Sequence, residues 1–401
     1  MAHQVTIIGG GFAGIACALR LARFKIKNLN IRVISDNANF EYHAALYRVV
    51  TGKSPMEVCL PLREIFAPYS NIEYIEDRIS TVDLVNKTLC GTSQCDYQFD
   101  YLVLALGSQT SYYNIPGLEK HAFGFKTIHE AIKLKHHIQE LFKFASNKDK
   151  DTILDDMRIV VVGGGPSGTE LAGELAVYTR KLANIYKIDP TLISIDLIQS
   201  PNRLIPQSTP KLSQVVQTKL KQLGVNLYLN RKVLKEDVEQ VYLKDLKMES
   251  KTLVWTAGTK PNILYSQIPN LQLTKSGKAQ VNSHFQTTNY KHIYVAGDGA
   301  EVKDSGLGQS AIAHGKHIAS HLKSQISKSP TPKPYTPHNW LMAIPVGPQW
   351  AAVEYNKFVI SGRLGWHLRR LLDFKVFTEF LPISKAFQAF KAGTVQWESG
   401  I

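Results

Sequence analysis

The sequence predicts an α/β fold that contains two copies of one strand–turn–helix unit, followed by a basic, amphipathic tail. The first copy opens the chain, where residues 5–8 (VTII) run into the glycine turn GGGFAG and an apolar helix pattern. The second opens with residues 159–162 (IVVV), the turn GGGPSG and a second helix pattern. In the tail, residues 358–392 place leucines near helical spacing with arginines between them.

Length and composition indicate an ordinary folded protein of two or three domains. The 401 residues are too many for one compact core, and 44% hydrophobic and 20% charged residues are typical of globular proteins. We expect no export signal and no spanning helix, because neither pattern occurs in the sequence. The 4 cysteines then favour a reducing compartment without a disulfide framework. The formal net charge of +14 suits an anionic partner, which could be nucleic acid, a membrane surface or a substrate.

Each glycine of the first turn has an expected role. Gly9 allows a tight turn, Gly11 the close approach of a pyrophosphate, and Gly14 the close packing of helix on strand. The phosphates would lie at the helix N-terminus, on free N–H groups. The next strand, residues 31–34, leads to Asp36, and an acid roughly 20 residues past the glycines is placed to bind a ribose hydroxyl.

The second turn repeats this pattern with Gly163, Gly165 and Gly168, and its second strand, residues 193–198, ends at Gln199. One such fingerprint is a weak signal, because glycine turns without a ligand also occur. Two fingerprints in the same context predict two dinucleotide sites. Two further strand ends, ALGS at 105–108 and the sequence ending in Gly-Asp at 297–298, fit a cofactor site or are simply strand ends.

The order of motifs is GGGFAG, an acid closing the second strand, ALGS, IPGLEKHAF, KTIHEA, GGGPSGTELAGEL, WTAG and VAGD. It resembles that of the two-domain FAD/NAD(P) oxidoreductases, and within them the single-subunit (type II) NADH:quinone oxidoreductases. The resemblance implies two Rossmann-like dinucleotide-binding domains, one inserted in the other. The FAD domain would comprise residues 1–113 and 263–328, and the NAD(P)H domain residues 114–262. A C-terminal membrane-associating region, residues 329–401, would follow a proline-rich linker.

The resemblance also implies the site residues. Those on the FAD side are Gly9, Gly11, Phe12, Ala13, Gly14, Asp36, Asn37, Ile79, Ala105, Gly107, Asp298, Gln309 and Ser310. Those on the nicotinamide side are Gly163, Gly165, Pro166, Gly168, Gln199 and Gly258. Glu170 matches the family glutamate that lies between nicotinamide and flavin, which makes it the catalytic candidate. The alternative for Glu170 is an acid that the helix dipole favours in a first turn.

Two positions depart from the family pattern. Gln199 stands where NADH-specific members carry an acid, so we expect NADPH to be tolerated, with Arg203 as a candidate partner of its phosphate. The quinone-side motif A-Q-x-A-x-Q is present as GQSAIA, in which Gln309 matches and Ala313 replaces the second glutamine. The quinone side is therefore assigned to Gln309 and Ala313, and a helix start without an acceptor role stays open.

Cysteine chemistry is not expected. Cys90 and Cys95 have the C-x4-C spacing of flavin disulfide reductases, but they lie in a later, turn-like stretch of the sequence. Cys17 and Cys59 do not form a second candidate pair.

The tail favours a membrane surface as the partner for the positive charge. Its helical pattern contains Leu364, Leu368, Leu371, Leu372 and Val376, with Arg363, Arg369, Arg370 and Lys375 between them. Basic helices with apolar side chains on the other face suit a membrane interface, where each cation contributes on the order of 1 kcal/mol. The alternative is a helix docked on the protein's own core or on a second subunit, so a homodimer stays open. The sequence shows no zinc spacing and no nucleic-acid module, so we expect neither partner.

The expected function is an FAD-dependent, non-proton-pumping NAD(P)H:quinone oxidoreductase, a type II NADH dehydrogenase. NADH or NADPH would reduce the flavin, and a membrane quinone would take the electrons. The protein would be peripheral, on the cytoplasmic face, held through residues 358–401. Two alternatives stay open: a soluble NAD(P)H-dependent reductase of a protein acceptor such as a ferredoxin, and a membrane-surface flavoprotein redox sensor.

Overall fold

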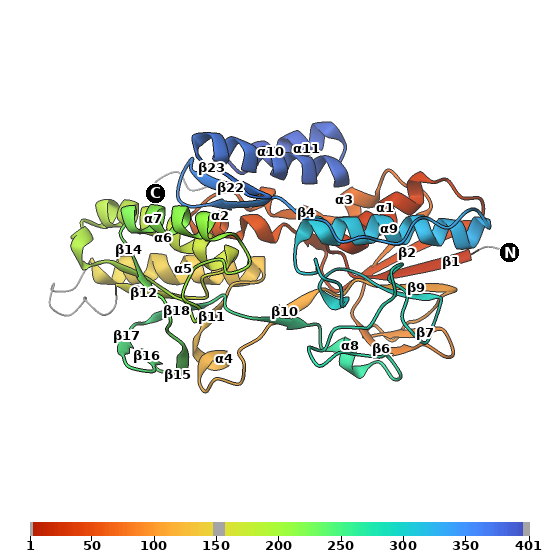
Figure 1. The fold of residues 1–401 in the computed structure, drawn as a ribbon, viewed down its shortest axis with the longest axis horizontal. Coiled ribbons are helices and arrows are strands. Elements are labelled where there is room, and N and C mark those ends of the chain that lie inside the picture. The colour runs from red at the N-terminus through yellow and green to blue at the C-terminus, as the bar shows by residue number, and fades with distance from the viewer. Residues whose placement is uncertain (1–2, 147–156, 396–401) are drawn as a thin grey trace.

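The computed structural model describes residues 3–146 and 157–395 and contains two parallel sheets side by side, with a third layer lying across both (Figure 1). Helices cover one face of each parallel sheet, and a small antiparallel meander lies against the other face. The predicted α/β class with parallel sheets is confirmed.

The first sheet has the strand order β20-β9-β1-β2-β5, and all four pairings are parallel. Its β20 comes from far along the chain and joins strands from the N-terminal third. Helices α1 and α9 pack against each other, and α1 packs on this sheet. The bounds are β1 His3–Ile8, α1 Phe12–Arg23, β2 Leu29–Ser35, β5 Ile72–Glu76, β9 Tyr101–Leu104, β20 Ile293–Val295 and α9 Gly308–Ser327.

The second sheet has the order β11-β18-β12-β13-β14 and is also entirely parallel. Its central strands are apolar on both faces, as expected for strands covered on each side. The bounds are β11 Phe123–Gly124, α5 Ile128–Ala145, β12 Arg158–Val162, α6 Pro166–Tyr186, β13 Ser194–Ile198, α7 Pro210–Gln222, β14 Val225–Tyr228 and β18 Thr252–Trp255.

Short elements decorate and connect the two sheets. An antiparallel ribbon of β10 and β19 joins the two parts of the molecule (Figure 1). The meanders are β6–β7–β8 below the first sheet and β15–β16–β17 below the second. The bounds are β3 Asn39–Glu41, α2 Leu46–Val50, β4 Cys59–Pro61, α3 Leu62–Phe66, β6 Ile79–Asp83, β7 Thr88–Gly91, β8 Asp96–Gln98, β10 Ser108–Thr110, α4 Leu118–His121, β15 Val233–Asp237, β16 Gln240–Leu243, β17 Lys247–Glu249, β19 Thr259–Pro261 and α8 Leu264–Gln267.

The C-terminal layer is an antiparallel sheet followed by two helices. Its bounds are β21 Met342–Pro345, β22 Ala351–Tyr355, β23 Phe358–Gly362, α10 Arg363–Phe380 and α11 Ile383–Ala392. We call the first parallel sheet with its helices the first part of the molecule, and the second sheet with its helices the second part. The C-terminal layer contacts α6 and α7 of the second part and α1 of the first, so it bridges both parts. Within the described part of the chain, no helix is both long and apolar enough to cross a membrane.

The expected basic face of α10 is corrected by the structure at two positions. Arg369 and Arg370 point into the protein and are only 5% and 4% exposed. Leu364 and Leu371 are 61% and 62% exposed instead. The spacing of leucines correctly predicted a helix here. It could not show that the buried face of this helix contains the ion-paired arginines Arg369 and Arg370.

Candidate functional site

The first glycine turn lies between β1 and α1 and leaves the start of the helix open. Gly9 has φ +115°, and a Cβ atom there would lie 2.3 Å from the Ala105 carbonyl oxygen. A Cβ on Gly14 would lie 2.0 Å from the Gly9 oxygen, which is the close packing of helix on strand predicted for it. At Gly11 a Cβ would meet nothing within 4 Å. Gly11 is also the helix N-cap and has no side chain to satisfy the first N–H groups of α1.

The second turn has the same geometry between β12 and α6. Gly163 has φ +116°, and its Cβ would meet Ala257 at 2.7 Å. A Cβ on Gly168 would lie 2.0 Å from the Gly163 oxygen, and one on Gly165 would meet nothing within 4 Å. Gly165 is the N-cap of α6, again without a side-chain cap, and Pro166 is the first helical residue. Each turn therefore presents an open helix N-terminus of the kind that binds a phosphate.

Strand order gathers the other predicted residues around these two turns. In the first part, the parallel neighbours β20, β9, β1 and β2 end at one edge, which brings Asp298, Ala105, Gly9 and Asp36 to the same side. Asp36 is exposed directly after β2. In the second part, β18, β12 and β13 bring Gly258, Gly163 and Gln199 to one edge.

The remaining FAD-side residues are spread over several elements around the first turn. Asn37 donates from Nδ2 to Glu41 Oε1 at 2.9 Å. Ile79 is buried at the start of β6, in the meander below the sheet and outside the sheet itself. Gly107 has φ +64°, a backbone conformation that favours glycine, and open space around it. Phe12 and Ala13 begin α1 itself.

Asp298 is held by two residues that sequence reasoning did not select. Ser108 donates from Oγ to Asp298 Oδ2 at 2.5 Å, and Lys126 donates from Nζ to Ser108 Oγ at 2.9 Å. The Lys126 Nζ atom is itself 4.0 Å from Asp298 Oδ2. Ser108 lies in the ALGS motif and Lys126 in the KTIHEA motif. Membership in these motifs was the only sequence signal that could have pointed to them.

The quinone-side residues lie in the first turns of α9. Gln309 donates from Nε2 to the Leu341 carbonyl oxygen at 3.1 Å, which ties α9 to the linker that precedes the C-terminal layer. Ser310 is fully buried and donates to the Leu307 oxygen at 2.8 Å. Ala313 follows Gln309 by one helical turn and therefore lies on the same side of α9.

The Gln199 side chain forms hydrogen bonds with the second glycine turn and with the loop after β13. Its Oε1 accepts from the Gly164 N–H at 2.7 Å, and its Nε2 donates to the Arg203 carbonyl oxygen at 3.3 Å. The Arg203 guanidinium donates to the carbonyl oxygens of Ser208, at 2.8 Å, and of Pro206. The Arg203 side chain is thus hydrogen-bonded within its own loop.

Glu170 lies in the first turns of α6, where α6 packs on α2. It is 7% exposed. Burial raises the pKa of Glu170 to about 8, although the positive charges of Arg369 and Arg48 oppose that rise. At neutral pH this carboxyl therefore holds a proton, which is an unusual state for a glutamate and one often found at functional sites.

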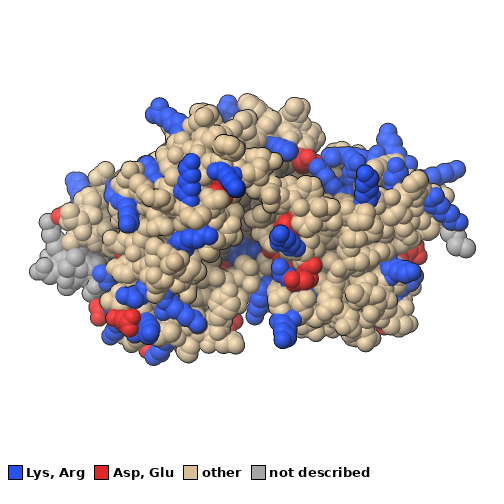
Figure 2. Space-filling model, viewed as in Figure 1, with Lys and Arg blue, Asp and Glu red and all other residues tan. Residues whose placement is uncertain are grey.

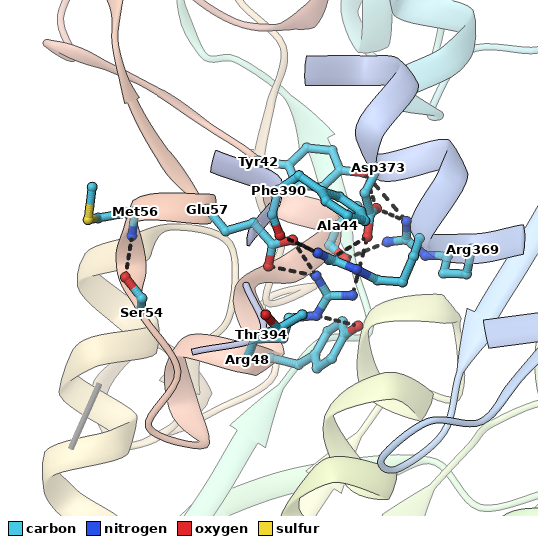
Figure 3. A network of polar contacts seen from close by, with 12 residues as sticks. Tyr42, Ala44, Arg48, Ser54, Met56, Glu57, Arg369, Asp373, Phe390 and Thr394 are labelled. Carbon is cyan, nitrogen blue, oxygen red and sulfur yellow. Dashed lines mark hydrogen bonds and ion pairs between the residues drawn. The ribbon is translucent and has the colours of Figure 1, made fainter. Parts of the chain in front are cut away.

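The charges of Arg369, Arg48 and Asp373, which act on Glu170, belong to a buried ion-pair network that sequence reasoning missed. Figure 3 shows this network. Arg48 Nη1 lies 2.6 Å from Glu57 Oε2, and Arg48 Nη2 lies 3.3 Å from Asp373 Oδ2. Arg370 pairs with both Glu57 and Asp373, and Arg369 pairs with Asp373. Three guanidinium groups thus face two carboxylates in the interior. The network attaches α10 to α2 and to the segment around Glu57, and no local sequence pattern links residues so far apart.

The structure places the four cysteines on separate segments of the first part of the chain. All four cysteines are free thiols. Cys90 lies in β7, and the Cys95 carbonyl oxygen accepts from the Gly91 N–H at 2.9 Å, so the pair belongs to the hairpin of the lower meander. Over residues 3–146 and 157–395, no group of three or more His, Cys, Asp or Glu side chains is arranged to hold a metal ion.

Two open glycine turns on neighbouring parallel sheets define a protein that binds two dinucleotides. The family model of pyridine nucleotide-disulphide oxidoreductases matches residues 3–316, and the chain belongs to that family.

Individual relatives narrow the comparison. The chain is 29% identical over 421 residues to the type II NADH:quinone oxidoreductase Ndh of Mycobacterium tuberculosis, with 98% of this chain and 89% of that protein covered. It is 25% identical over 334 residues to the type II NADH:quinone oxidoreductase of Staphylococcus aureus strain NCTC 8325, with 80% and 82% covered.

Solved structures share the fold. The structure of NDH2 from Plasmodium falciparum in complex with NADH has a TM-score of 0.84 at 17% identity, with 100% of both chains covered. The sulfide:quinone oxidoreductase of Aquifex aeolicus has a TM-score of 0.79 at 19% identity, with 96% of this chain and 94% of that chain covered.

Proposed function

We propose that the chain is a type II NADH:quinone oxidoreductase, an FAD enzyme that oxidises NAD(P)H and reduces a membrane quinone. The observation that carries the proposal is the pair of glycine turns, each open at a helix N-terminus. The relatives that bear this name add support, since one of them is similar over 98% of this chain.

The first turn would hold the pyrophosphate of FAD, on the N–H groups at the start of α1. Asp36 would accept from the adenosine ribose and Asp298 from the ribityl chain, both as carboxylates at the same sheet edge. FAD, when bound, supplies the ring that accepts a hydride and gives up electrons. Ser108 and Lys126 hold the Asp298 carboxylate in one place, which lowers the cost of ordering it for a ligand.

The second turn would hold the pyrophosphate of NADH or NADPH in the same way. Gly258 would allow the nucleotide to approach, and Gln199 would keep the turn closed through the Gly164 N–H. Glu170, on the helix that starts at this turn, holds a proton at neutral pH because burial raises its pKa to about 8. A neutral carboxyl neither repels an anionic ligand nor needs a counter-ion, and its O–H can donate a hydrogen bond.

Gln309 and Ala313 would form the quinone side, one turn apart on α9. Ala313 stands where the family motif has a second glutamine, so the quinone side is less polar in this protein. The Gln309 amide is then the polar group of the motif that could contact a quinone. A protein acceptor such as a ferredoxin would instead present an acidic surface, and this protein would need a basic patch to bind it. Figure 2 gives this rival little support on the face it displays, because Lys and Arg side chains are spread over that face rather than gathered on one element.

The proposal includes attachment to the cytoplasmic face of a membrane by the C-terminal layer. Exposed apolar side chains cluster in its last strands and helices; we call them the apolar tail face. They are Tyr355, Phe358, Ile360, Leu364, Leu371, Ile383 and Phe387. Monomeric proteins rarely expose so many large apolar groups in one region unless it binds a membrane or a partner. A second copy of the chain is the alternative occupant.

Turnover of the FAD-loaded protein tests the reaction. NADH or NADPH should bleach the flavin rapidly, and a short-chain quinone in detergent should then sustain oxidation of the nucleotide. A flavin that is reduced but does not react with any quinone would remove the acceptor from the proposal and favour the ferredoxin-type rival. Slow turnover with every acceptor, together with tight nucleotide retention, would favour the sensor.

Two alanine variants test the assignment of the two turns. Gly11→Ala and Gly165→Ala add a methyl group that meets no protein atom within 4 Å, so both variants should fold. Gly11→Ala should weaken FAD binding, because the methyl group occupies the phosphate's place. Gly165→Ala should keep FAD and slow its reduction by NAD(P)H. The reverse pattern, or no effect in either variant, would contradict the assignment.

A further inference from the structure

Asp304 is a buried acceptor at the point where α9, the loop after β20 and the proline-rich linker meet. Its Oδ2 accepts from Tyr335 Oη at 2.8 Å, from Trp340 Nε1 at 2.9 Å and from the His338 N–H at 3.4 Å. Its Oδ1 lies 3.2 Å from His314 Nε2. The hydrogen bonds from Trp340, Tyr335 and His314 lower the pKa of Asp304 against the opposing effect of burial, so it is an anion that can only accept. Asp304 thus holds the linker against α9 and orients one histidine.

The second ring nitrogen of His314, Nδ1, accepts a hydrogen bond from the loop that contains Gly297 and Asp298. The Gly297 N–H donates to His314 Nδ1 at 3.3 Å, and the imidazole is fully buried. A backbone N–H can only donate, so Nδ1 must be the acceptor and Nε2 must carry the proton that is given to Asp304. Burial lowers the pKa of His314, which keeps the ring neutral. The two partners together fix one tautomer.

Gly297 immediately precedes Asp298 and has φ +69°. A Cβ atom at Gly297 would lie 3.6 Å from Ala13 Cβ in α1 and 3.7 Å from Ala311 Cβ in α9. The loop therefore lies close to both helices, with room for no more than a Cβ atom between them. Ser305 donates to the Gly297 carbonyl oxygen at 2.9 Å, while His314 accepts from its N–H. Both backbone groups of this residue have fixed partners.

We propose that His314 is a positioning residue of the FAD site, which holds the Gly297 N–H and with it the loop that presents Asp298, while Asp304 fixes the required tautomer. The proposal rests on the proposed function only in assigning FAD to the Asp298 loop. His314 follows Ala313 on α9 and is turned away from the quinone side, so its role differs from that of the missing glutamine. The competing explanation is packing, because His314 also lies 4.5 Å from the ring of Phe285 and 5.2 Å from that of Tyr335, between ring centroids.

Two isosteric variants separate the two hydrogen bonds. His314→Asn places an amide oxygen where Nδ1 was, so it can still accept from Gly297 but cannot reach Asp304. His314→Gln places an amide nitrogen near the former Nε2, so it can reach Asp304 but leaves the Gly297 N–H without a partner. Titration of the apoprotein with FAD, followed by flavin fluorescence, gives the dissociation constant, and a redox titration gives the flavin midpoint potential.

His314→Gln should weaken FAD binding by roughly tenfold and shift the midpoint potential, because a buried N–H is left unpaired. His314→Asn should stay within about twofold of the wild type in affinity, since that N–H keeps its acceptor. Equal losses in both variants, or no loss in His314→Gln, would overturn the proposal and leave a packing role.

Hydrogen exchange covers the case in which neither variant folds. In the wild-type apoprotein, the amide of Gly297 should be protected, and rapid exchange there would overturn the proposal. None of these three measurements depends on quinone turnover. A wild-type protein that binds FAD but reduces no quinone would therefore count against the proposed function and not against the role of His314.

Discussion

At the scale of single residues, the polar side chains of the site have hydrogen-bond partners within the protein. Gln199 accepts from Gly164, Asp298 accepts from Ser108, and Gln309 donates to Leu341. Prior ordering of this kind lowers the entropic cost of binding. A substitution at one of these residues therefore changes both the contact with the ligand and the hydrogen bonds that hold the neighbouring backbone.

Gln199→Glu should sharpen the preference for NADH over NADPH. A glutamate carboxylate can still accept from the Gly164 N–H, although it loses the hydrogen bond that Gln199 donates to the Arg203 carbonyl oxygen. It adds a charge that repels a 2′-phosphate and accepts from ribose hydroxyls. We expect the ratio of kcat/KM for NADH to kcat/KM for NADPH to rise about tenfold, which corresponds to about 1.4 kcal/mol. An unchanged ratio would show that this position does not set the preference.

Glu170 should impose a pH dependence on the reaction. Its pKa of about 8 means that the carboxyl is protonated below that pH and ionised above it, so activity that needs the neutral form should decline as pH rises through about 8. In Glu170→Gln, which is neutral at every pH, this inflection should be absent from the profile of kcat/KM for NAD(P)H. Persistence of the same inflection in the variant would assign it to another group.

At the scale of elements, α10 has two opposite faces with different chemistry. The face toward the protein carries Arg369, Arg370 and Asp373, and the outward face carries Leu364 and Leu371. Burial of ion pairs is costly unless each charge has partners, and here three arginines share two carboxylates with further acceptors nearby. The helix is therefore attached by polar contacts as well as apolar ones.

Asp373→Ala should strongly destabilise the attachment of α10. It leaves the buried arginines facing Glu57 alone, and removal of one member of a buried ion pair costs about 3–5 kcal/mol. Thermal unfolding of the purified protein would measure the loss. Lys375→Ala is the matched control, because this residue is exposed on the same helix and should change stability by no more than about 0.5 kcal/mol. Similar losses in both variants would contradict the role given to the network.

At the scale of the whole molecule, the net charge of +14 and the apolar tail face act over different distances. The charge attracts the protein toward an anionic surface and is screened by salt over about 10 Å at 0.1 M. The exposed leucines and aromatic side chains contribute only on contact, through burial of apolar area. Arg369 and Arg370 cannot touch such a surface, because both are buried and paired with carboxylates inside the protein.

Replacement of both Leu364 and Leu371 by Asp should abolish binding to vesicles of phosphatidylcholine and phosphatidylglycerol in a sedimentation assay. Each leucine contributes about 1.5 kcal/mol or more when buried in acyl chains, so the pair accounts for a loss of roughly a hundredfold or more. Val85→Asp is the control, since Val85 is 68% exposed but lies between the strands of a meander far from the tail in sequence. Equal loss in the control, or retained binding in the double variant, would favour charge alone or a subunit contact.

The sequence by itself determined what short-range patterns encode. The two glycine turns and their flanking strands and helices follow from spacing within a few residues, because glycine conformation and helix starts are local properties. The family order of motifs then implied which strand ends meet.

Only the tertiary structure decided the contacts between distant segments. Arg48 and Asp373 meet across most of the chain, and Asp304 gathers the linker and His314, although no local period marks any of them. The inward direction of Arg369 and Arg370 could not be read from helical spacing, because a buried arginine and an exposed one have the same period. Burial and charge pairing depend on what packs against a helix, and only the folded chain supplies that information.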